Sequence, residues 1–217
     1  MAGYAVIPAA GMSLRMGRPK LLLPIGDQPV LARVLQVMTG PPITRCVVVA
    51  RHHDLAVQQL VAQYPADLVC PEPPPEDMLS SIRAGVSFLQ QQVAPQSDDG
   101  WWVQPADHPA VSAALLDRLW QEFQQGREAC VPVCAGRRGH PLLIRWKYTA
   151  ALQAIPPGEG LNWLFRDQRV VLHHVPWDDP LSQADLDTPE DYARLMQELT
   201  VRTKIPSQAE GQPHGLS

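Results

Sequence analysis

The sequence lacks any apolar run of the length that a membrane helix needs, which is about 18–20 residues. It also lacks a basic, apolar leader that ends in a cleavage site. These two absences predict a cytoplasmic protein that has no membrane partner.

Positive charge is not in excess either. The 22 acidic residues outnumber the 18 basic ones and give a net charge of −4. A general nucleic-acid binder carries a basic surface, so we expect no nucleic-acid partner. The basic residues are instead concentrated locally, notably at Arg15 to Lys20 and at Arg137-Arg138.

Cysteine is scarce, with only four residues, and they do not form the paired CxxC spacing of a zinc site. Cys130 and Cys134 are spaced CxxxC, and no second pair completes a metal site. Cys46 and Cys130 lie in apolar, strand-like runs. We therefore expect free, partly buried thiols.

Two common phosphate-binding motifs are missing. A P-loop needs a lysine directly after its second glycine, and here Arg18 and Pro19 intervene before Lys20. The GxGxxG turn of dinucleotide-binding proteins does not occur in this segment.

The segment from Val6 to Pro24 nevertheless has the features of a nucleotide-binding loop. The apolar strand 4–8 runs into the small residues Ala9, Ala10 and Gly11, and the cations Arg15 and Lys20 follow. Gly11 and Gly17 can take positive φ and let the backbone approach a ligand. Backbone N–H groups with two cations suit a triphosphate.

The rest of the chain alternates between strand and helix patterns. Apolar runs predict strands at residues 4–8, 46–50, 67–70, 101–104, 129–133, 141–146 and 169–175. Stripes of helical period predict helices at 28–38, 54–64, 79–89, 112–123 and from 188 onward. This alternation predicts an α/β fold, a Rossmann-like three-layer α/β/α domain with a mainly parallel sheet.

The length of 217 residues fits one such domain, which we place at residues 1–202. Residues 203–217 contain almost no large apolar side chains and are predicted to be a disordered tail. In an open parallel sheet, ligands bind beyond the carboxyl ends of the strands.

Carboxylates are found where such a ligand would bind. Asp107 directly follows the predicted strand 101–104 and offers the oxygen ligands that Mg²⁺ prefers. Alternation points Asp185 and Asp187 to the same side of the chain, so either one could complete the metal site with Asp107. The competing interpretations are a turn residue for Asp107 and a helix start capped by Thr188 for the second segment.

Residues 9–20, of the form AAGxSxRMGxxK and followed by Leu-Leu-Leu-Pro24, resemble the signature of the MobA-like nucleotidyltransferases. The Ala-Ala-Gly start is closer to the molybdenum cofactor cytidylyltransferase branch than to the guanylyltransferase branch, which has Ala-Gly-Gly. Asp185 to Asp191 resembles the family's Asp-Ile-Asp-Thr-Pro-Glu-Asp element. The family fold is that of the nucleotide-diphospho-sugar transferases.

Weaker matches extend the resemblance along the chain. Asp107 and Pro109 match the family's Leu-Gly-Asp-Gln-Pro site, where Ala106 and His108 depart from the pattern. Residues 138–141 resemble the Gly-His-Pro element that faces the acceptor, and residues 76–85 resemble a Met-x-x-Ser-Leu-x-x-Gly stretch. Residues 157–162 stand where cytidylyltransferases carry Gly-Asp-x-Gly-Ala-Arg, with Asn162 in place of the arginine.

The resemblance implies a Mg²⁺-dependent enzyme that transfers CMP from CTP to molybdopterin-type molybdenum cofactor and releases pyrophosphate. It implies catalytic roles for Arg15, Lys20 and Asp107, and Mg²⁺ ligands in Asp107 and Asp185. The implied nucleotide contacts are Ala9, Ala10, Gly11, Ser13, Arg15, Lys20, Ser80 and Ser81. The implied acceptor contacts are His140 and Asp187.

Three alternatives stay open from the sequence. In the first, the chain is a nucleotidyltransferase that uses another NTP, or a sugar or alditol phosphate as acceptor. In the second, it is an ordinary nucleotide-binding module. In the third, it is a non-catalytic accessory protein that binds the cofactor for a molybdoenzyme, which would then be a further partner. The departures at Ala106, Glu159 and Asn162 favour this last alternative.

Overall fold

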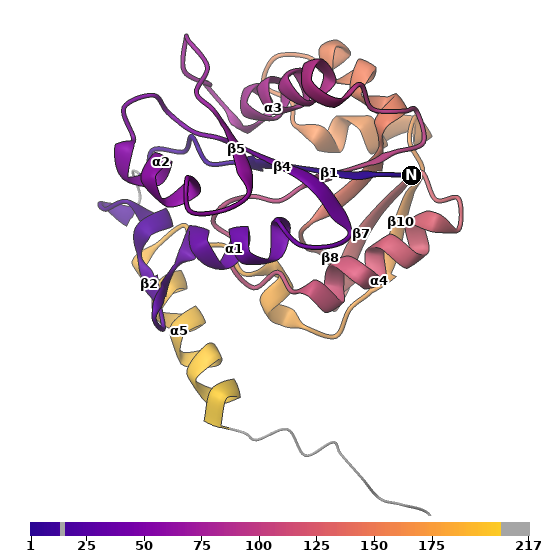
Figure 1. Cartoon of the computed structure of the whole chain (residues 1–217). Coiled ribbons are helices and arrows are strands. Elements are labelled where there is room, and N and C mark those ends of the chain that lie inside the picture. The colour runs from indigo at the N-terminus through magenta and orange to yellow at the C-terminus, as the bar shows by residue number, and fades with distance from the viewer. Residues whose placement is uncertain (14–15, 205–217) are drawn as a thin grey trace, which may run out of the picture.

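The computed structural model describes residues 1–13 and 16–204 (Figure 1). Its centre is a sheet of eight strands in the order β10-β7-β9-β6-β1-β4-β5, with β8 paired to β7. The strands are β1 Gly3–Pro8, β4 Ile43–Val49, β5 Ala66–Val69, β6 Gly100–Val103, β7 Ala129–Cys134, β8 Arg137–Arg138, β9 Leu142–Arg145 and β10 Leu172–Pro176. A separate hairpin joins β2 Pro24–Ile25 to β3 Gln28–Pro29.

Most of the sheet is parallel, as predicted. β1 is parallel to β4 and β6, β4 to β5, and β7 to β10. β9 is the exception within this order, because it runs antiparallel to both β6 and β7. Its insertion leaves β6 and β7 pointing the same way, so their carboxyl ends share one edge of the sheet.

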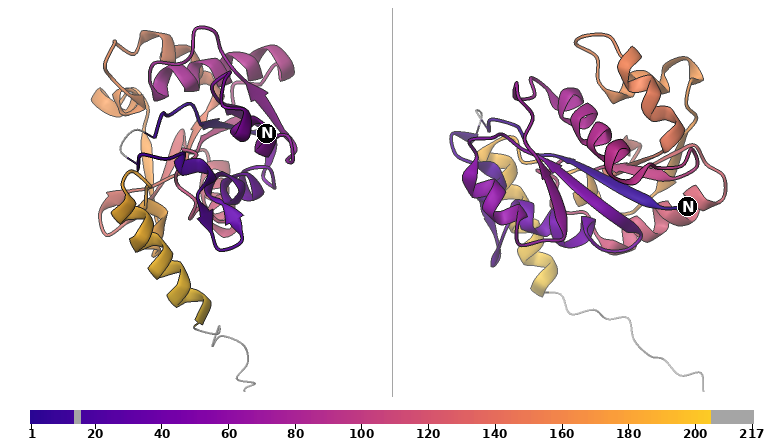
Figure 2. Two further views of the ribbon diagram at one scale, coloured as in Figure 1. Left: turned by 90° about the vertical axis from the view of Figure 1, so that its left-hand side faces the viewer. Right: turned by 45° about the horizontal axis from the view of Figure 1, so that its top comes forward.

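Helices cover both faces, which confirms the three-layer α/β/α prediction. Figure 1 shows α3 Met78–Val93 on one side of the sheet, with α1 Val30–Met38 and α4 Ala113–Gln124 on the other. The 3₁₀ segments η3 Trp146–Ala154 and η4 Leu161–Gln168 share the face of α3 (Figure 2). The α2 helix, Leu55–Val61, packs on the face of α1 and α4.

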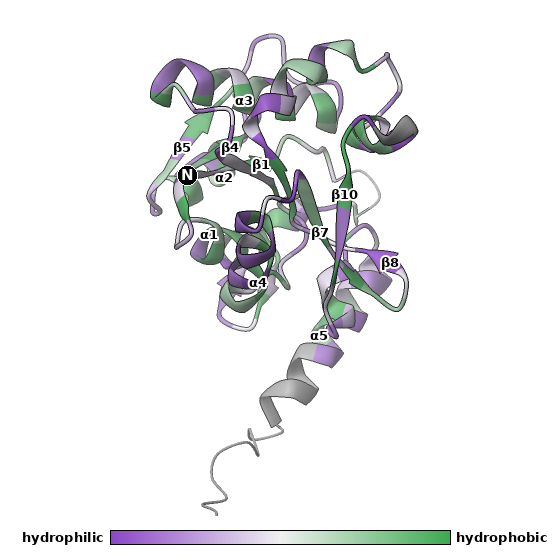
Figure 3. Cartoon of the chain, turned by 90° about the vertical axis from the view of Figure 1, so that its right-hand side faces the viewer, coloured by the Kyte–Doolittle hydropathy of each residue, from purple (hydrophilic) through white to green (hydrophobic). Residues whose placement is uncertain are grey.

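The sequence pattern explains the two cores. Successive strand residues point to opposite faces, so Trp102 packs with α1 and α4 while Trp101 packs with α3. Both indoles are fully buried. Figure 3 shows the hydrophobic colour along β1 and β7, and the hydrophilic colour on β8.

The α1 helix follows its predicted stripe but starts later than residue 28. Gln28 and Pro29 pair with β2, and the helix begins at Val30. The buried residues of the stripe are Val30, Leu31, Val34, Leu35 and Met38.

The last segment returns to the sheet edge before it leaves the body. After the short η5 Pro180–Gln183, Thr188 and Asp191 exchange capping hydrogen bonds at the start of α5 Pro189–Lys204. Leu195 packs into the core with Tyr192 and Met196 beside it, and the C-terminal part of α5 projects from the domain (Figure 1). Residues 205–217 of the predicted tail lie outside the described residues.

Two expectations from composition can be compared with the described part of the chain. Its helices include none with the length and apolar character that crossing a bilayer would require. Cys46, Cys70, Cys130 and Cys134 are free; Cys46 and Cys130 are buried and the other two partly so.

Candidate active site

A cavity of about 410 Å³ opens at the carboxyl ends of β1, β4 and β6. This is the edge at which ligands bind in open α/β sheets. Its walls come from the loops after these strands, from the start of η2 Lys20–Leu22 and from the start of α3. The lining includes the predicted residues Ala9, Ala10, Gly11, Ser13, Lys20, Ser81, Asp107 and Asp187.

The loop after β1 is shaped differently from the sequence prediction at one position. Gly17 has a φ of 64°, as expected, but the second positive φ belongs to Ser13, at 51°, and not to Gly11. The Ser13 hydroxyl accepts a hydrogen bond from the backbone N–H of Lys20 at 3.3 Å. This contact ties the two halves of the loop together. Arg15 lies outside the described residues.

Lys20 lies between two carboxylates. Its Nζ is 2.5 Å from Asp107 Oδ2 and 3.1 Å from Asp187 Oδ1. Burial acts to lower the pKa of Lys20, but the two carboxylates outweigh it, so the pKa is raised above its ordinary value. Lys20 is therefore a fixed cation at neutral pH.

The pKa of Asp107 is lowered for a matching reason. Burial would raise the pKa of this carboxyl, but the nearby His108 and the hydrogen-bonded Lys20 reverse the effect. Burial also lowers the pKa of His108, which is then neutral at pH 7. Lys20 is thus the cation that keeps Asp107 ionised.

Gln104 shapes the loop that carries Asp107. This side chain is fully buried at the end of β6, and its Nε2 donates to the carbonyls of Pro105 and His108 at 3.2 and 2.9 Å. The amide therefore spans the two ends of the Asp107 turn. The sequence analysis missed this residue, although a polar side chain closing an apolar strand was an available signal.

The structure separates the two acids of the Asp185–Asp187 pair. Leu186 is fully buried in the core, so its neighbours point to the opposite side, as alternation predicted. Asp187 reaches Lys20, whereas Asp185 is exposed and does not line the cavity. The assignment of the metal ligand remains a prediction, and the geometry favours Asp187.

His140 lies against the Asp107 loop. The His140 and His108 rings are 4.5 Å apart in an edge-to-face arrangement, and His108 Nε2 is 3.8 Å from Asp107 Oδ1. Burial and the adjacent His108 lower the pKa of His140 to about 3. The predicted acceptor-facing element therefore contributes a neutral imidazole next to the Asp107 loop, and the His140 side chain does not itself line the cavity.

The two serines of α3 have different positions. Asp77 caps the helix by accepting from the backbone N–H and the hydroxyl of Ser80, both at 2.7 Å. Ser81 is buried, lines the cavity and donates to the Asp77 carbonyl at 3.2 Å. Asp77 is therefore the helix cap, and of the two serines only Ser81 lines the cavity, where the predicted ligand contact would be made.

Arg51 is a cavity residue that the sequence analysis did not identify. It follows β4 and donates from Nε to the carbonyl of Ala10 at 2.5 Å. A charged residue just after a buried strand could have suggested this position. Arg51 fixes the small-residue segment that forms the floor of the cavity.

The donor set suits a divalent cation that also binds phosphate. Among the described residues, no group of three or more His, Cys, Asp or Glu side chains is placed to hold a metal. Asp107 and Asp187 nevertheless lie close together, because each has a carboxylate oxygen within 3.1 Å of Lys20 Nζ. Mg²⁺ commonly takes one or two carboxylates and completes its shell with water and substrate phosphates. The residues present fit that mode of binding.

Comparison with known proteins finds related sequences along most of the chain. The profile of the MobA-like NTP transferase domain matches residues 5–174. A Bacillus anthracis protein named probable molybdenum cofactor guanylyltransferase is 28% identical over 209 residues, which span 92% of this chain and 99% of that protein.

Solved structures share the fold. A Mycobacterium tuberculosis protein in complex with manganese superposes with a TM-score of 0.72 at 25% identity, over 91% of this chain and 99% of the other. A 4-diphosphocytidyl-2C-methyl-D-erythritol synthase gives a TM-score of 0.74 at 18% identity, over 91% and 99% of the two chains, and it shows the fold alone.

Proposed function

The chain belongs to the MobA-like NTP transferase family and is a nucleotidyltransferase, and we propose that it transfers CMP from CTP to the molybdopterin form of the molybdenum cofactor. The observation that carries the proposal is Lys20, held between Asp107 and Asp187 at a cavity on the carboxyl edge of the sheet. This arrangement provides one fixed cation and two oxygen ligands where a triphosphate would bind.

In the proposed reaction, a phosphate oxygen of the acceptor attacks the α-phosphorus of the nucleotide. A new P–O bond forms, the bond to the β-phosphate oxygen breaks, and pyrophosphate leaves. The protein forms no covalent bond in this scheme, so positioning and charge neutralisation provide the rate acceleration.

The residues of the chain have separate tasks in the scheme. Lys20 donates to the triphosphate once the nucleotide offers oxygens that compete with the two carboxylates. Asp107 and Asp187 would hold a divalent cation, Mg²⁺ in this proposal, which supplies neutralisation of the phosphate charge when bound. Ser81 and the backbone of Ala9 to Gly11 line the cavity for ribose and base.

The choice of CTP depends on the floor of the cavity. Ala10 is 6% exposed, and its carbonyl is held by Arg51, so its methyl group occupies a fixed place. A glycine at this position would let the larger edge of a purine approach the backbone. A second candidate is GTP, because the Bacillus anthracis relative is named a guanylyltransferase.

A pyrophosphate-release assay with four NTPs and molybdenum cofactor tests the proposal. We expect kcat/KM for CTP to exceed that for GTP by at least tenfold, or about 1.4 kcal/mol. Ala10→Gly should lower the ratio of kcat/KM for CTP to kcat/KM for GTP. Ala62→Gly, at the exposed end of α2, should leave this ratio unchanged.

The possible outcomes separate the alternatives. Equal use of CTP and GTP by the wild-type protein would exclude the cytidylyl assignment, and preference for GTP would favour the second candidate. Turnover with a sugar or alditol phosphate, and none with molybdenum cofactor, would show that the acceptor is the sugar or alditol phosphate. Tight cofactor binding without pyrophosphate release from any nucleotide would indicate an accessory protein.

A further inference from the structure

Arg51 is the second cation of the cavity. Of the described residues that line the cavity, only Lys20 and Arg51 carry a positive charge. Lys20 is shared by Asp107 and Asp187, whereas Arg51 has no carboxylate oxygen within 4.0 Å in the part of the chain that the structure describes. The proposed reaction uses Lys20 and does not yet account for the Arg51 guanidinium.

The structure holds Arg51 in place through its backbone and its side chain. Its carbonyl accepts from Gln58 Nε2 at 3.0 Å, so α2 anchors the backbone at this position. Its Nε donates to the Ala10 carbonyl at 2.5 Å. The two terminal nitrogens of the guanidinium have no hydrogen-bond partner among the described residues. They are therefore a planar pair of donors that a ligand in the cavity can use.

Arg51 and the Lys20–Asp107–Asp187 cluster lie on opposite sides of β1. The strands here are ordered β6-β1-β4; Asp107 follows β6 and Arg51 follows β4. Two strand spacings, or about 10 Å, separate the ends of these strands. In a nucleotide, the ribose separates the α-phosphate from the base. A nucleotide whose phosphates meet Lys20 can thus place its base beside Arg51.

The wall next to Arg51 favours a base over a phosphate chain. The α3 helix passes directly over β1 and β4, because a methyl group at Gly85 would lie 2.6 Å from Val6 Cγ1 and 3.2 Å from Val49 Cγ2. The start of this helix and the residues before it line the cavity with Pro75, Glu76, Asp77 and Met78. Two carboxylates repel a triphosphate, whereas the proline and the methionine offer apolar contacts to a neutral ring.

A pair of parallel donors selects a base by its acceptors. Cytosine has two adjacent acceptors, O2 and N3, whereas uracil has an N3–H donor between its two carbonyl groups. Guanine also has two acceptors, O6 and N7, and adenine has an amino donor next to N7. A guanidinium fork thus fits cytosine or guanine and opposes uracil or adenine. Bidentate pairing of this kind discriminates between bases by about 5- to 150-fold.

We propose that Arg51 is a specificity-determining residue that donates from its two terminal nitrogens to adjacent acceptors of the nucleotide base, O2 and N3 of cytosine. The inference rests on the proposed function, in which the nucleotide occupies this cavity. Arg51 discriminates against uracil and adenine. The Ala10 methyl group, whose backbone Arg51 holds, discriminates against guanine.

Calorimetry of nucleotide binding with Mg²⁺ and without acceptor tests the assignment. The wild-type protein should bind CTP at least tenfold more tightly than UTP. Arg51→Lys keeps the charge and removes the planar fork, so the ratio of the two affinities should fall below about threefold. Loss of the Ala10 contact acts on both nucleotides and cancels in this ratio. A wild-type ratio near one, or a ratio that Arg51→Lys leaves unchanged, overturns the proposal.

Inorganic triphosphate distinguishes a contact with the base from a contact with the phosphates. Arg51→Met should bind it within about threefold of the wild-type affinity, because this ligand has no base. Retained binding also shows that the cavity of the variant is folded. A tenfold or greater loss of triphosphate affinity, in a variant with the wild-type Tm, would assign Arg51 to the phosphates and overturn the proposal.

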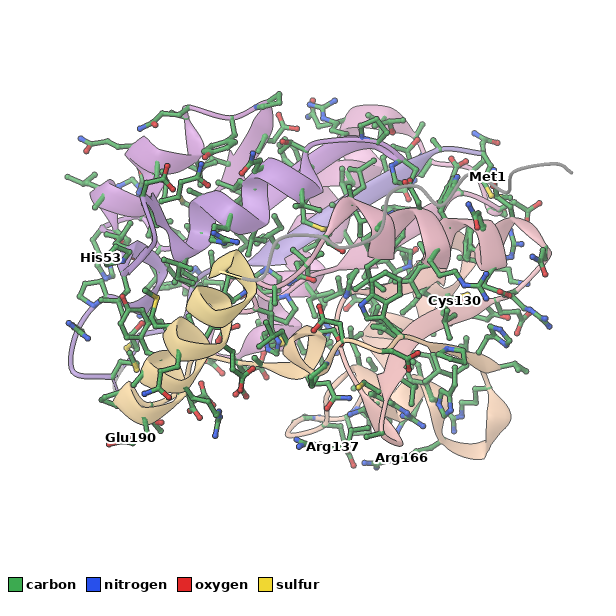
Figure 4. The ribbon with its side chains drawn as sticks, turned by 90° about the horizontal axis from the view of Figure 1, so that it is seen from below. Met1, His53, Cys130, Arg137, Arg166 and Glu190 are labelled. Atoms are coloured by element: carbon green, nitrogen blue, oxygen red, sulfur yellow. The ribbon has the colours of Figure 1, made fainter. Side chains whose placement is uncertain are left out.

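The matched control is Arg127→Lys. Arg127 is exposed and precedes β7, at the edge of the sheet opposite the cavity. In Figure 4, His53, two residues after Arg51, lies far from Cys130, three residues after Arg127. This substitution should leave the ratio of CTP to UTP affinity at its wild-type value. An equal decrease of the ratio in Arg127→Lys and Arg51→Lys would overturn the proposal.

Binding of all four nucleotides separates this inference from the proposed function. Tighter binding of GTP than of CTP, with UTP and ATP at least tenfold weaker than either, would reject cytidylyl transfer and support the Arg51 contact. Selective binding of CTP without turnover of molybdenum cofactor would likewise reject only the transfer activity. Equal binding of the four nucleotides rejects the Arg51 contact whatever acceptor the protein uses.

Discussion

Replacement of Lys20 by methionine separates the catalytic and structural roles of the Lys20–Asp107–Asp187 cluster. The substitution keeps most of the side-chain volume and removes the ammonium group that lies 2.5 and 3.1 Å from the two carboxylates. The same change therefore alters nucleotide neutralisation, fold stability and metal affinity, and the structure gives a direction for each.

Catalysis should fall steeply. Loss of one preorganised charge contact to the reacting phosphates costs about 2–4 kcal/mol of transition-state stabilisation. This corresponds to a decrease in kcat/KM of about 30- to 1,000-fold. The pyrophosphate-release assay measures it directly.

Stability without metal should also fall, because Asp107 and Asp187 are left facing each other. Removing one partner of a fully buried ion pair costs about 3–5 kcal/mol. Here the two carboxylates are 19% and 28% exposed, so water screens part of their repulsion. We expect a loss of about 1–3 kcal/mol, seen as a decrease in Tm of about 2–10 °C.

Metal affinity should change in the opposite direction. In the wild-type protein, Lys20 competes with a divalent cation for the same two carboxylates, whereas the methionine variant leaves them free of that competition. Mg²⁺ should therefore raise Tm more in Lys20→Met than in the wild-type protein, since the stabilisation by a ligand grows with the logarithm of its affinity for the folded state. The variant should bind metal more tightly and turn over more slowly.

The pH dependence follows from the two pKa shifts. The lowered pKa of Asp107 gives stability that is present above the ordinary value of 3.8 and is lost as pH falls through the folded pKa. The raised pKa of Lys20 gives stability that is present below 10.5 and is lost as pH rises through its folded pKa. The difference in Tm between wild type and Lys20→Met should thus be greatest between these two limits.

Lys147→Met is the matched control, because Lys147 pairs with Glu128 and is 42% exposed, away from the cavity. It should change neither turnover nor the effect of Mg²⁺ on Tm. Near wild-type kcat/KM in Lys20→Met, or a weaker response to Mg²⁺ than in wild type, would refute the account of this cluster.

Two further substitutions, each compared with a second variant, test how the site is assembled. At limiting Mg²⁺, Asp187→Asn should lower kcat/KM by more than about 100-fold. Asp185→Asn should have little effect on kcat/KM, because Asp185 is exposed and does not line the cavity. A larger loss of kcat/KM in Asp185→Asn than in Asp187→Asn would assign the metal to Asp185. Gly139→Ala should lower the free energy of unfolding by about 1–3 kcal/mol in chemical denaturation, because the new methyl group would lie 2.7 Å from the Ser182 carbonyl oxygen. Gly160→Ala, which meets no atom within 4 Å, should have no such effect, and equal stabilities of the two variants would contradict the close approach at Gly139.

The sequence was sufficient for the fold class because periodicity is a local property. Each apolar run coincides with a strand of the sheet, and the helical stripes coincide with the main helices. Their alternation along the chain predicts the mainly parallel sheet with helices on both faces that is observed. The direction of β9 was not predictable, since an antiparallel strand and a parallel strand have the same apolar pattern when both faces are buried.

The irregular regions were also beyond the sequence analysis. The 3₁₀ segment η3 has no clear helical stripe, and η4 is only eight residues long, shorter than the window that a helical pattern needs. Tertiary contacts stabilise η3. Arg83 of α3, for example, donates to the carbonyls of Leu152 and Ile155 at the end of η3. Such a contact joins residues far apart in the chain and leaves no periodic signal.

The site was predicted to the level of segments and only partly to the level of residues. Lys20 is 87 residues from Asp107 and 167 from Asp187, and a topological rule brings all three segments to one edge of the sheet. The rule does not say which carboxylate of the Asp185–Asp187 pair faces Lys20, because both point to the same side. That choice depends on where the backbone crosses the edge, which the close approach of Gly139 to Ser182 and the burial of Leu186 determine together. A change that moves this contact should therefore alter the metal dependence of turnover.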